Sequence, residues 1–177
     1  MKSKKFILIL YGSSCAGKST IIESLSAKVP ELFHLSTDRI KWSISQYKAG
    51  MHNDMLLEMV FQLGKMAAAD GLSLVMDGTP TIESENWKKY KALAEEKGMA
   101  FYEVNMEADL EILKARFEDR VKNAPTSGKK LSNTSMERFM LLYDLHSKNK
   151  HEGIPTFYSD KQSVEEITGE ILKIIEN

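Results

Sequence analysis

The chain has 177 residues, of which 42% are hydrophobic and 28% are charged, and its formal net charge at pH 7 is −1. This composition predicts one soluble globular domain over residues 1–177, with no overall charge that would favour binding to nucleic acid or to an anionic membrane. No stretch is long enough to span a bilayer, so no membrane partner is expected and a nucleic-acid partner is disfavoured. The single cysteine, Cys15, excludes an intrachain disulfide and indicates the reducing cytoplasm.

The first predicted elements surround a glycine-rich loop. Residues 6–10 form a continuous apolar run, which is typical of a strand buried on both faces. The next segment, Gly12-Ser13-Ser14-Cys15-Ala16-Gly17-Lys18-Ser19-Thr20, has the G-x-x-x-x-G-K-S pattern of phosphate-binding loops. Apolar residues at helical spacing then continue to Pro30. Strand, loop and helix in this order are what the motif requires, so an ordinary glycine turn is the weaker interpretation.

Each part of this loop has a physical purpose. Gly12 and Gly17 let the backbone bend so that successive N–H groups point at phosphate oxygens. Lys18 brings positive charge to the β- and γ-phosphates, and the Ser19 hydroxyl is placed to hold Mg²⁺. The following helix offers its positive end to the same anion. We therefore expect residues 12–20 to bind a nucleotide.

A short second strand is predicted at residues 33–36, and it ends beside Asp38. Ligands gather at the carboxyl edge of an open parallel sheet. An aspartate at that edge can accept the proton of an attacking hydroxyl, so Asp38 is a candidate catalytic base. Alternatively, Asp38 caps a helix that begins at Arg39, and both roles stay open.

The next predicted helix carries a broad apolar stripe, which indicates that it faces the core. The stripe consists of Met55, Leu56, Met59, Val60, Leu63 and Met66. A buried strand follows at residues 72–76 and ends in Asp77-Gly78. We expect Asp77 to bind Mg²⁺, directly or through water, although Asp-Gly is also a common turn pair. Thr81 or Ser84 is expected to cap the next helix.

A fourth strand at residues 101–105 precedes a helix opened by Asp109. Arg116 and Arg120 lie one turn apart on this helix, and guanidinium groups can stabilise a phosphoryl group in transfer. The alternative is a solvated helix face. Residues 122–133 are polar and predict a mobile loop, so a lid is expected at about residues 121–133.

The last predicted elements are two helices and a short strand. Capping boxes at Thr134-x-x-Glu137 and Ser163-x-x-Glu166 open the helices. The strand lies at residues 156–158, between them. Alternating elements of this kind predict an α/β protein with a parallel sheet.

Four motifs in chain order resemble those of the small P-loop kinases. They are residues 10–19, Ser36-Thr37-Asp38-Arg39-Ile40, residues 74–78, and Leu113-x-x-Arg116-x-x-x-Arg120. The chain is most similar to the chloramphenicol phosphotransferase-like group, within a wider set that includes zeta toxin and polynucleotide kinase. The resemblance covers nearly the whole chain, and only the phosphate-loop motif is highly specific.

This resemblance implies a three-layer P-loop fold, with a five-stranded parallel sheet of order 2-3-1-4-5, helices on both faces and a short lid. It implies Mg-ATP as phosphoryl donor, Asp38 as the base, and phosphate contacts from Arg116 and Arg120. It also implies that adenine lies against residues 158–161. The family's chloramphenicol enzymes carry a second acidic residue where this chain has Gly78, and residues 42–57 match no acceptor pattern. The antibiotic is therefore not implied as substrate.

The expected function is an ATP-dependent kinase that transfers the γ-phosphoryl group of Mg-ATP to a hydroxyl of a small molecule. One alternative is a nucleoside, nucleotide or polynucleotide 5′-hydroxyl kinase, for which only Lys122, Lys129 and Lys130 hint at a basic groove. Another is a nucleotide-binding switch without transfer activity.

Overall fold

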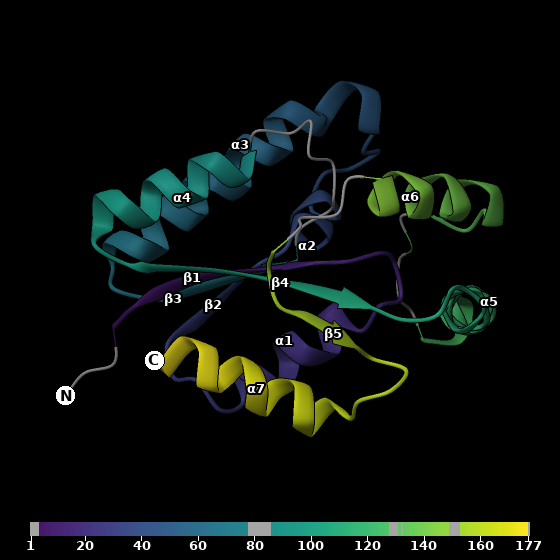
Figure 1. The fold of residues 1–177 in the computed structure, drawn as a ribbon. Helices are drawn as coiled ribbons and strands as arrows, with labels where there is room; N and C mark the ends of the chain where they lie inside the picture. Colours follow the sequence, from purple (N-terminus) through teal and green to yellow (C-terminus); the bar gives the residue numbers. More distant parts are fainter. Residues whose placement is uncertain (1–3, 78–85, 128–130, 132, 149–152, 177) are drawn as a thin grey trace.

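Five parallel strands form one sheet of order β2-β3-β1-β4-β5, with helices on both of its faces (Figure 1). The computed structural model describes residues 4–77, 86–127, 131, 133–148 and 153–176. The strands are β1 (Phe6–Tyr11), β2 (Leu32–Leu35), β3 (Ser73–Asp77), β4 (Ala100–Glu107) and β5 (Thr156–Tyr158). The predicted fold and strand order are thus confirmed.

The helices connect successive strands, except for the last helix, which follows β5. They are α1 (Lys18–Ser26), α2 (Thr37–Lys41), α3 (Ala49–Ala69), α4 (Asn86–Lys97), α5 (Leu110–Ser127), α6 (Met136–Lys148) and α7 (Val164–Glu176). In the described part of the chain, none of them has the length and apolar character needed to cross a membrane.

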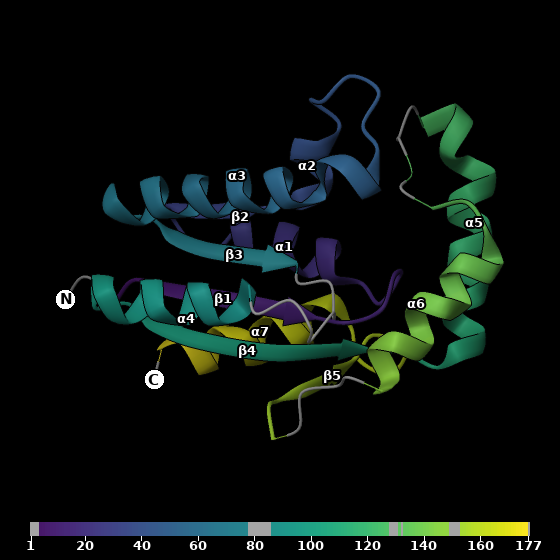
Figure 2. The same cartoon turned by 90° about the horizontal axis from the view of Figure 1, so that it is seen from above.

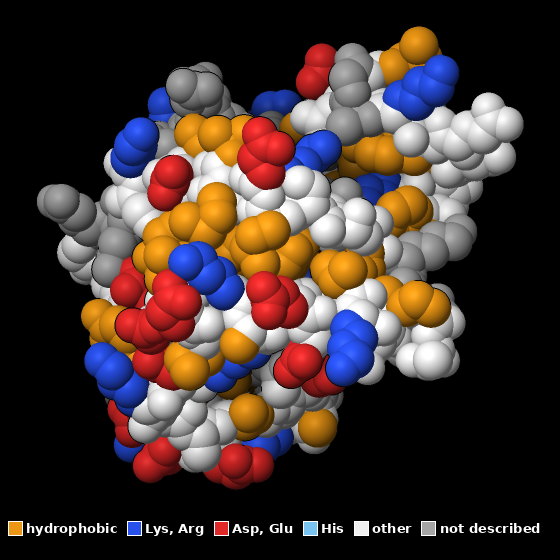
Figure 3. All heavy atoms as spheres, turned by 90° about the vertical axis from the view of Figure 1, so that its right-hand side faces the viewer, with side chains coloured by type: hydrophobic (Ala, Val, Ile, Leu, Met, Phe, Trp, Pro, Cys, Tyr) orange, Lys and Arg blue, Asp and Glu red, His pale blue; other side chains and the backbone are white. Residues whose placement is uncertain are grey.

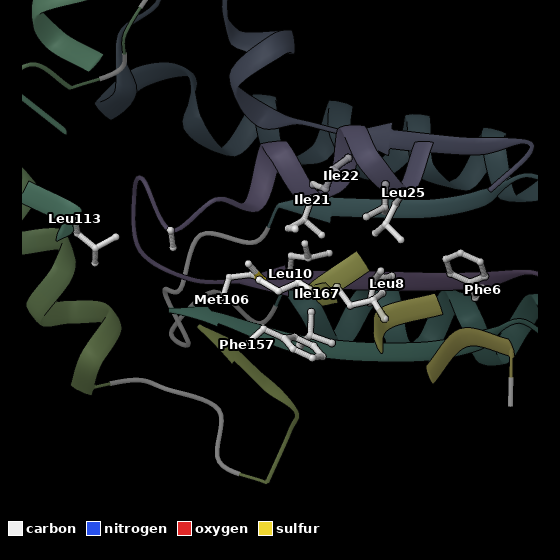
Figure 4. Packing of buried hydrophobic residues seen from close by; sticks show 14 of the residues in the cluster. Phe6, Leu8, Leu10, Ile21, Ile22, Leu25, Met106, Leu113, Phe157 and Ile167 are labelled. Atoms are coloured by element: carbon white, nitrogen blue, oxygen red, sulfur yellow. The ribbon is translucent and has the colours of Figure 1, made fainter. Parts of the chain in front are cut away.

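Alternate side chains of the central strand β1 point into two separate hydrophobic cores. Leu8 and Leu10 pack against α1 and α7 on one face, as Figure 4 shows from close by. Ile7 and Ile9 pack against α3 and α4 on the other face. All six residues of β1 are buried, which explains the continuous apolar run in the sequence.

The carboxyl ends of the strands all lie at one edge of the sheet, because the strands are parallel. Figure 2 shows β3 and β4 running toward the end of the molecule that carries α5 and α6. The loop after β1, the start of α2 and the end of β3 therefore share this edge.

Only part of the stripe predicted to be buried on α3 faces the core. Leu56 and Val60 are buried, whereas the methionine side of the stripe is exposed. Its exposed members are Met55, Met59, Leu63 and Met66. The core-facing line runs instead through Gly64, where an added Cβ would stand 3.0 Å from the Leu35 side chain. Small residues let the helix approach the sheet closely, so the bulky methionines are turned outward.

Two predicted features between β4 and β5 are also wrong. Helix α5 continues to Ser127, so the first half of the predicted 122–133 loop is helical, with Pro125 inside it. A proline this close to the end removes one hydrogen bond and leaves the preceding turns intact. The cap of α6 is Ser135 rather than Thr134, because the Ser135 Oγ accepts a hydrogen bond from the Arg138 N–H at 3.3 Å. The capping box at Ser163 is confirmed.

Several predictions fall on residues outside the described ranges. These residues are Gly78, the proposed caps Thr81 and Ser84, and the lysines Lys129 and Lys130 of the predicted lid.

Candidate active site

The glycine loop between β1 and α1 packs tightly against β4. Gly12 has φ +146°, and an added Cβ would lie 2.3 Å from the Met106 carbonyl oxygen. Gly17 has φ +89° and precedes the first turn of α1. Cys15 also has a positive φ, 67°, which is uncommon for a residue with a side chain. Left-handed residues within a turn direct backbone N–H groups into one concavity, which is the arrangement that binds anions.

Lys18 reaches back across this loop. Its Nζ donates hydrogen bonds to the carbonyl oxygens of Gly12 at 2.6 Å and Ser13 at 2.8 Å. Burial lowers the pKa of the Lys18 ammonium from 10.5 to about 8, although the carboxylates of Asp77 and Asp38 act in the opposite direction. The charge of Arg120 lowers the pKa further. The fold thus brings both aspartates and Arg120 within electrostatic range of Lys18.

Asp77, at the end of β3, holds a buried carboxylate oxygen. Its Oδ1 has no hydrogen-bond partner in the described structure, and the His34 Nε2 lies 3.5 Å away. The buried Oγ of Ser13 also has no partner there, and Ser19 is exposed at the start of α1. Carboxylate and hydroxyl oxygens are the donors that Mg²⁺ prefers. The residues present therefore fit the expected ion.

Asp38 lies in the first turn of α2, and its side chain is 51% exposed. The helix cap is Ser36, whose Oγ accepts a hydrogen bond from the Arg39 N–H at 3.4 Å. The alternative interpretation of Asp38 as the cap is therefore wrong. Its carboxylate instead accepts a hydrogen bond from Lys41, whose ammonium also lies 5.0 Å from the centre of the Trp42 ring.

Arg116 connects the glycine loop to the segment after β5. Its Nη1 donates to the Cys15 carbonyl oxygen at 3.3 Å and to the Ser159 Oγ at 2.8 Å, and its Nη2 donates to the Ser159 carbonyl oxygen at 2.9 Å. Arg120, one turn further along α5, is exposed. Ser159 lies within the segment where the resemblance places adenine. Arg116 thus fixes that segment relative to the loop.

Sequence reasoning missed two members of this site, His34 and Lys41, and it did not predict the contact between Ser159 and Arg116. A lone histidine in a strand and a lysine three residues after an aspartate have no distinctive spacing. The contact between Ser159 and Arg116 is recognisable only once β5 is placed beside β4, because it spans 43 residues.

The comparison with protein families matches residues 7–142 to the family described as AAA domain. The chain belongs to this family. Among curated proteins, none matches the sequence.

Solved structures that share the fold include the following three. One is a candidate kinase of Chloroflexus aurantiacus, with a TM-score of 0.73 and 14% identity over 96% of this chain and 98% of that chain. Another is the Mycobacterium tuberculosis APS kinase CysC, solved with AMPPNP and APS, with a TM-score of 0.66 and 16% identity over 99% of each chain. The third is the Deinococcus radiodurans tunicamycin resistance protein, with a TM-score of 0.62 and 10% identity over 97% and 96%. At these identities, the similarity establishes the fold alone.

Proposed function

We propose that the protein is an ATP-dependent kinase that transfers the γ-phosphoryl group to a hydroxyl of a small molecule, as its resemblance to chloramphenicol phosphotransferase-like proteins implies. The observation that carries this proposal is the cluster around Lys18. Lys18 donates hydrogen bonds to two carbonyl oxygens of the glycine loop, and the charges of Asp77, Asp38 and Arg120 act on the same ammonium. A switch module would need the loop and the metal ligands, but it would have no use for Asp38 as a proton acceptor.

The loop would hold the triphosphate. Backbone N–H groups of Gly12, Ser13, Ser14, Cys15, Ala16, Gly17, Lys18, Ser19 and Thr20 would surround the phosphates. The Lys18 ammonium, which donates to two loop carbonyls, would turn to the β- and γ-phosphate oxygens. The M. tuberculosis APS kinase of the same fold was solved with AMPPNP, which supports a nucleotide at this loop. Arg116 would keep the adenine segment at a fixed distance from the phosphates.

Ser19 and Asp77 would hold Mg²⁺. When bound, this ion neutralises charge on the β- and γ-phosphates and orients them. The position of Asp77 supports this assignment, because the residue lies at the carboxyl end of β3 and its charge acts on Lys18 of the glycine loop.

Asp38 would act on the acceptor. Its half-exposed carboxylate would take the proton of the alcohol while the alcohol oxygen bonds to the γ-phosphorus. The bond from the γ-phosphorus to the bridging oxygen would break, and ADP would leave with that electron pair. Lys18 and the arginines Arg116 and Arg120 would stabilise the charge that spreads over the transferred group.

The described side chains on the face shown in Figure 3 support a small acceptor rather than a polynucleotide. The end that carries α5 and α6 shows basic, acidic and hydrophobic side chains intermixed, with no single sign of charge dominating the view (Figure 3). Polynucleotide binding depends on several basic groups neutralising phosphates.

The test is a transfer assay with γ-labelled ATP and a panel of small alcohols, nucleosides and 5′-hydroxyl oligonucleotides. We expect label in the product of one small alcohol, and a loss of at least about 100-fold in rate for Lys18→Ala. Lys28→Ala, which changes an exposed lysine beyond the end of α1, is the matched control. Nucleotide binding with no labelled product from any acceptor would instead favour the switch, and full activity of Lys18→Ala would overturn the proposed site.

A further inference from the structure

Two buried polar atoms face each other at the ends of β2 and β3. The Nε2 of His34 and the Oδ1 of Asp77 lie 3.5 Å apart, and neither has a hydrogen-bond partner in the described part of the chain. The side chain of His34 is 11% exposed and that of Asp77 is 20% exposed. Water therefore has little access to either atom.

The sheet itself creates this contact. His34 is paired in register with Val75 on the neighbouring parallel strand. Side chains alternate along a strand, so Val75 and Asp77 point to the same face of the sheet as His34. The imidazole thus lies on the same face of the sheet as the carboxylate, at the register position two residues before Asp77. Because both residues belong to paired strands rather than to loops, the backbone ladder fixes their relative position.

A histidine is an unexpected choice for this position if only packing matters. The other residues of β2 are Leu32, Phe33 and Leu35, which are all apolar. Burying a polar ring costs free energy unless it finds a partner. A leucine would fill the space without that cost. The presence of a histidine is explained if its ring nitrogen interacts with the carboxylate of Asp77.

We propose that His34 is a positioning residue for Asp77. In the tautomer that carries the proton on Nε2, the ring would donate a hydrogen bond to Oδ1 and leave Oδ2 directed at the Mg²⁺ site. This role rests on the proposed function, because Asp77 is its assumed ion ligand. A carboxylate held at one oxygen cannot rotate freely, and such outer partners orient metal ligands in many proteins.

The experiment measures Mn²⁺ binding to the complex of the protein with ADP by electron paramagnetic resonance. Three variants are compared with the wild type. His34→Leu removes the donor and keeps an apolar filler, His34→Gln keeps an N–H near the Nε2 position, and Phe33→Leu changes the neighbouring residue, whose side chain packs in the core of the opposite face. ADP binding is also measured in EDTA, without metal, and folding is checked by circular dichroism.

We expect His34→Leu to weaken Mn²⁺ binding by about 10–100-fold, with ADP affinity in EDTA unchanged. His34→Gln should recover most of the loss, and Phe33→Leu should bind Mn²⁺ as the wild type does. Unchanged Mn²⁺ affinity in His34→Leu, or a His34→Gln protein as defective as His34→Leu, would overturn the inference.

The failure of this inference can be distinguished from failure of the proposed function. Asp77→Asn should abolish most Mn²⁺ binding to the ADP complex if Asp77 holds the ion. If Asp77→Asn has this effect while His34→Leu does not, the metal site stands and the role of His34 is wrong. If the wild type binds no ADP, or Asp77→Asn binds Mn²⁺ normally, the metal site itself is wrong.

Discussion

Gly12→Ala is expected to damage both the stability of the protein and its nucleotide site. The added Cβ would lie 2.3 Å from the Met106 carbonyl oxygen and 3.2 Å from the carbonyl carbon. Met106 is fully buried in β4, which pairs with β1 and β5, so the loop rather than the strand must move. Moving the contact to ordinary van der Waals range takes about 1 Å. Backbone strain and overpacking each cost about 1–3 kcal/mol, or about 2–6 kcal/mol together.

Gly98→Ala separates strain from steric clash. Gly98 also has a positive φ, +63°, but nothing lies within 4 Å of an added Cβ. Gly98→Ala should lower the free energy of unfolding by only about 1–2 kcal/mol, which is the cost of holding a residue with a side chain in the left-handed backbone conformation. Urea denaturation measures both losses, and calorimetry measures ATP affinity, which should fall in Gly12→Ala alone. Equal stability losses together with normal ATP binding in Gly12→Ala would refute the reasoning.

Three further predictions follow from single contacts. Because burial lowers the Lys18 pKa to about 8, and a bound triphosphate should raise it, ATP affinity should fall as pH rises above 8. Calorimetry in two buffers should then show proton uptake on binding at pH 9, and its absence would contradict a charged Lys18 in the complex. Arg116→Ala should lower the free energy of unfolding by about 1–3 kcal/mol, because the Ser159 oxygens lose their charged donor; an unchanged urea midpoint would contradict this. Ser163→Ala removes the α7 cap, whose hydroxyl accepts a hydrogen bond from the Glu166 N–H. The free energy of unfolding should fall by about 0.5–2 kcal/mol in the same assay. Ser26→Ala, which changes a serine at the end of α1, is the control that leaves the α7 cap intact.

The sequence predicts the central parts of the fold well, for identifiable reasons. Strands buried on both faces have continuous apolar runs, as in β1, and the glycine loop has both a fixed spacing and a required context. Once this strand, loop and helix are recognised, Asp38 and Asp77 are predictable as residues at the carboxyl edge, because parallel strands end together.

Other features depend on packing that periodicity does not encode. The i, i+4 stripe of α3 does not reveal that Gly64 allows close approach to Leu35, which turns the methionines outward. Ser135 and Thr134 are equally good caps by residue type, and only the path of the chain selects one. His34 gains meaning only from the register of β2 on β3, which places its ring beside Asp77.

The most direct test of the central claim is a crystal structure with Mg²⁺ and a non-hydrolysable ATP analogue. We predict phosphates on the backbone N–H groups of residues 13–20, Asp77 directed at the ion, and the Asp38 carboxylate beside the space beyond the γ-phosphate. An analogue bound away from the loop, or both carboxylates turned away from the γ-phosphate, would contradict the account.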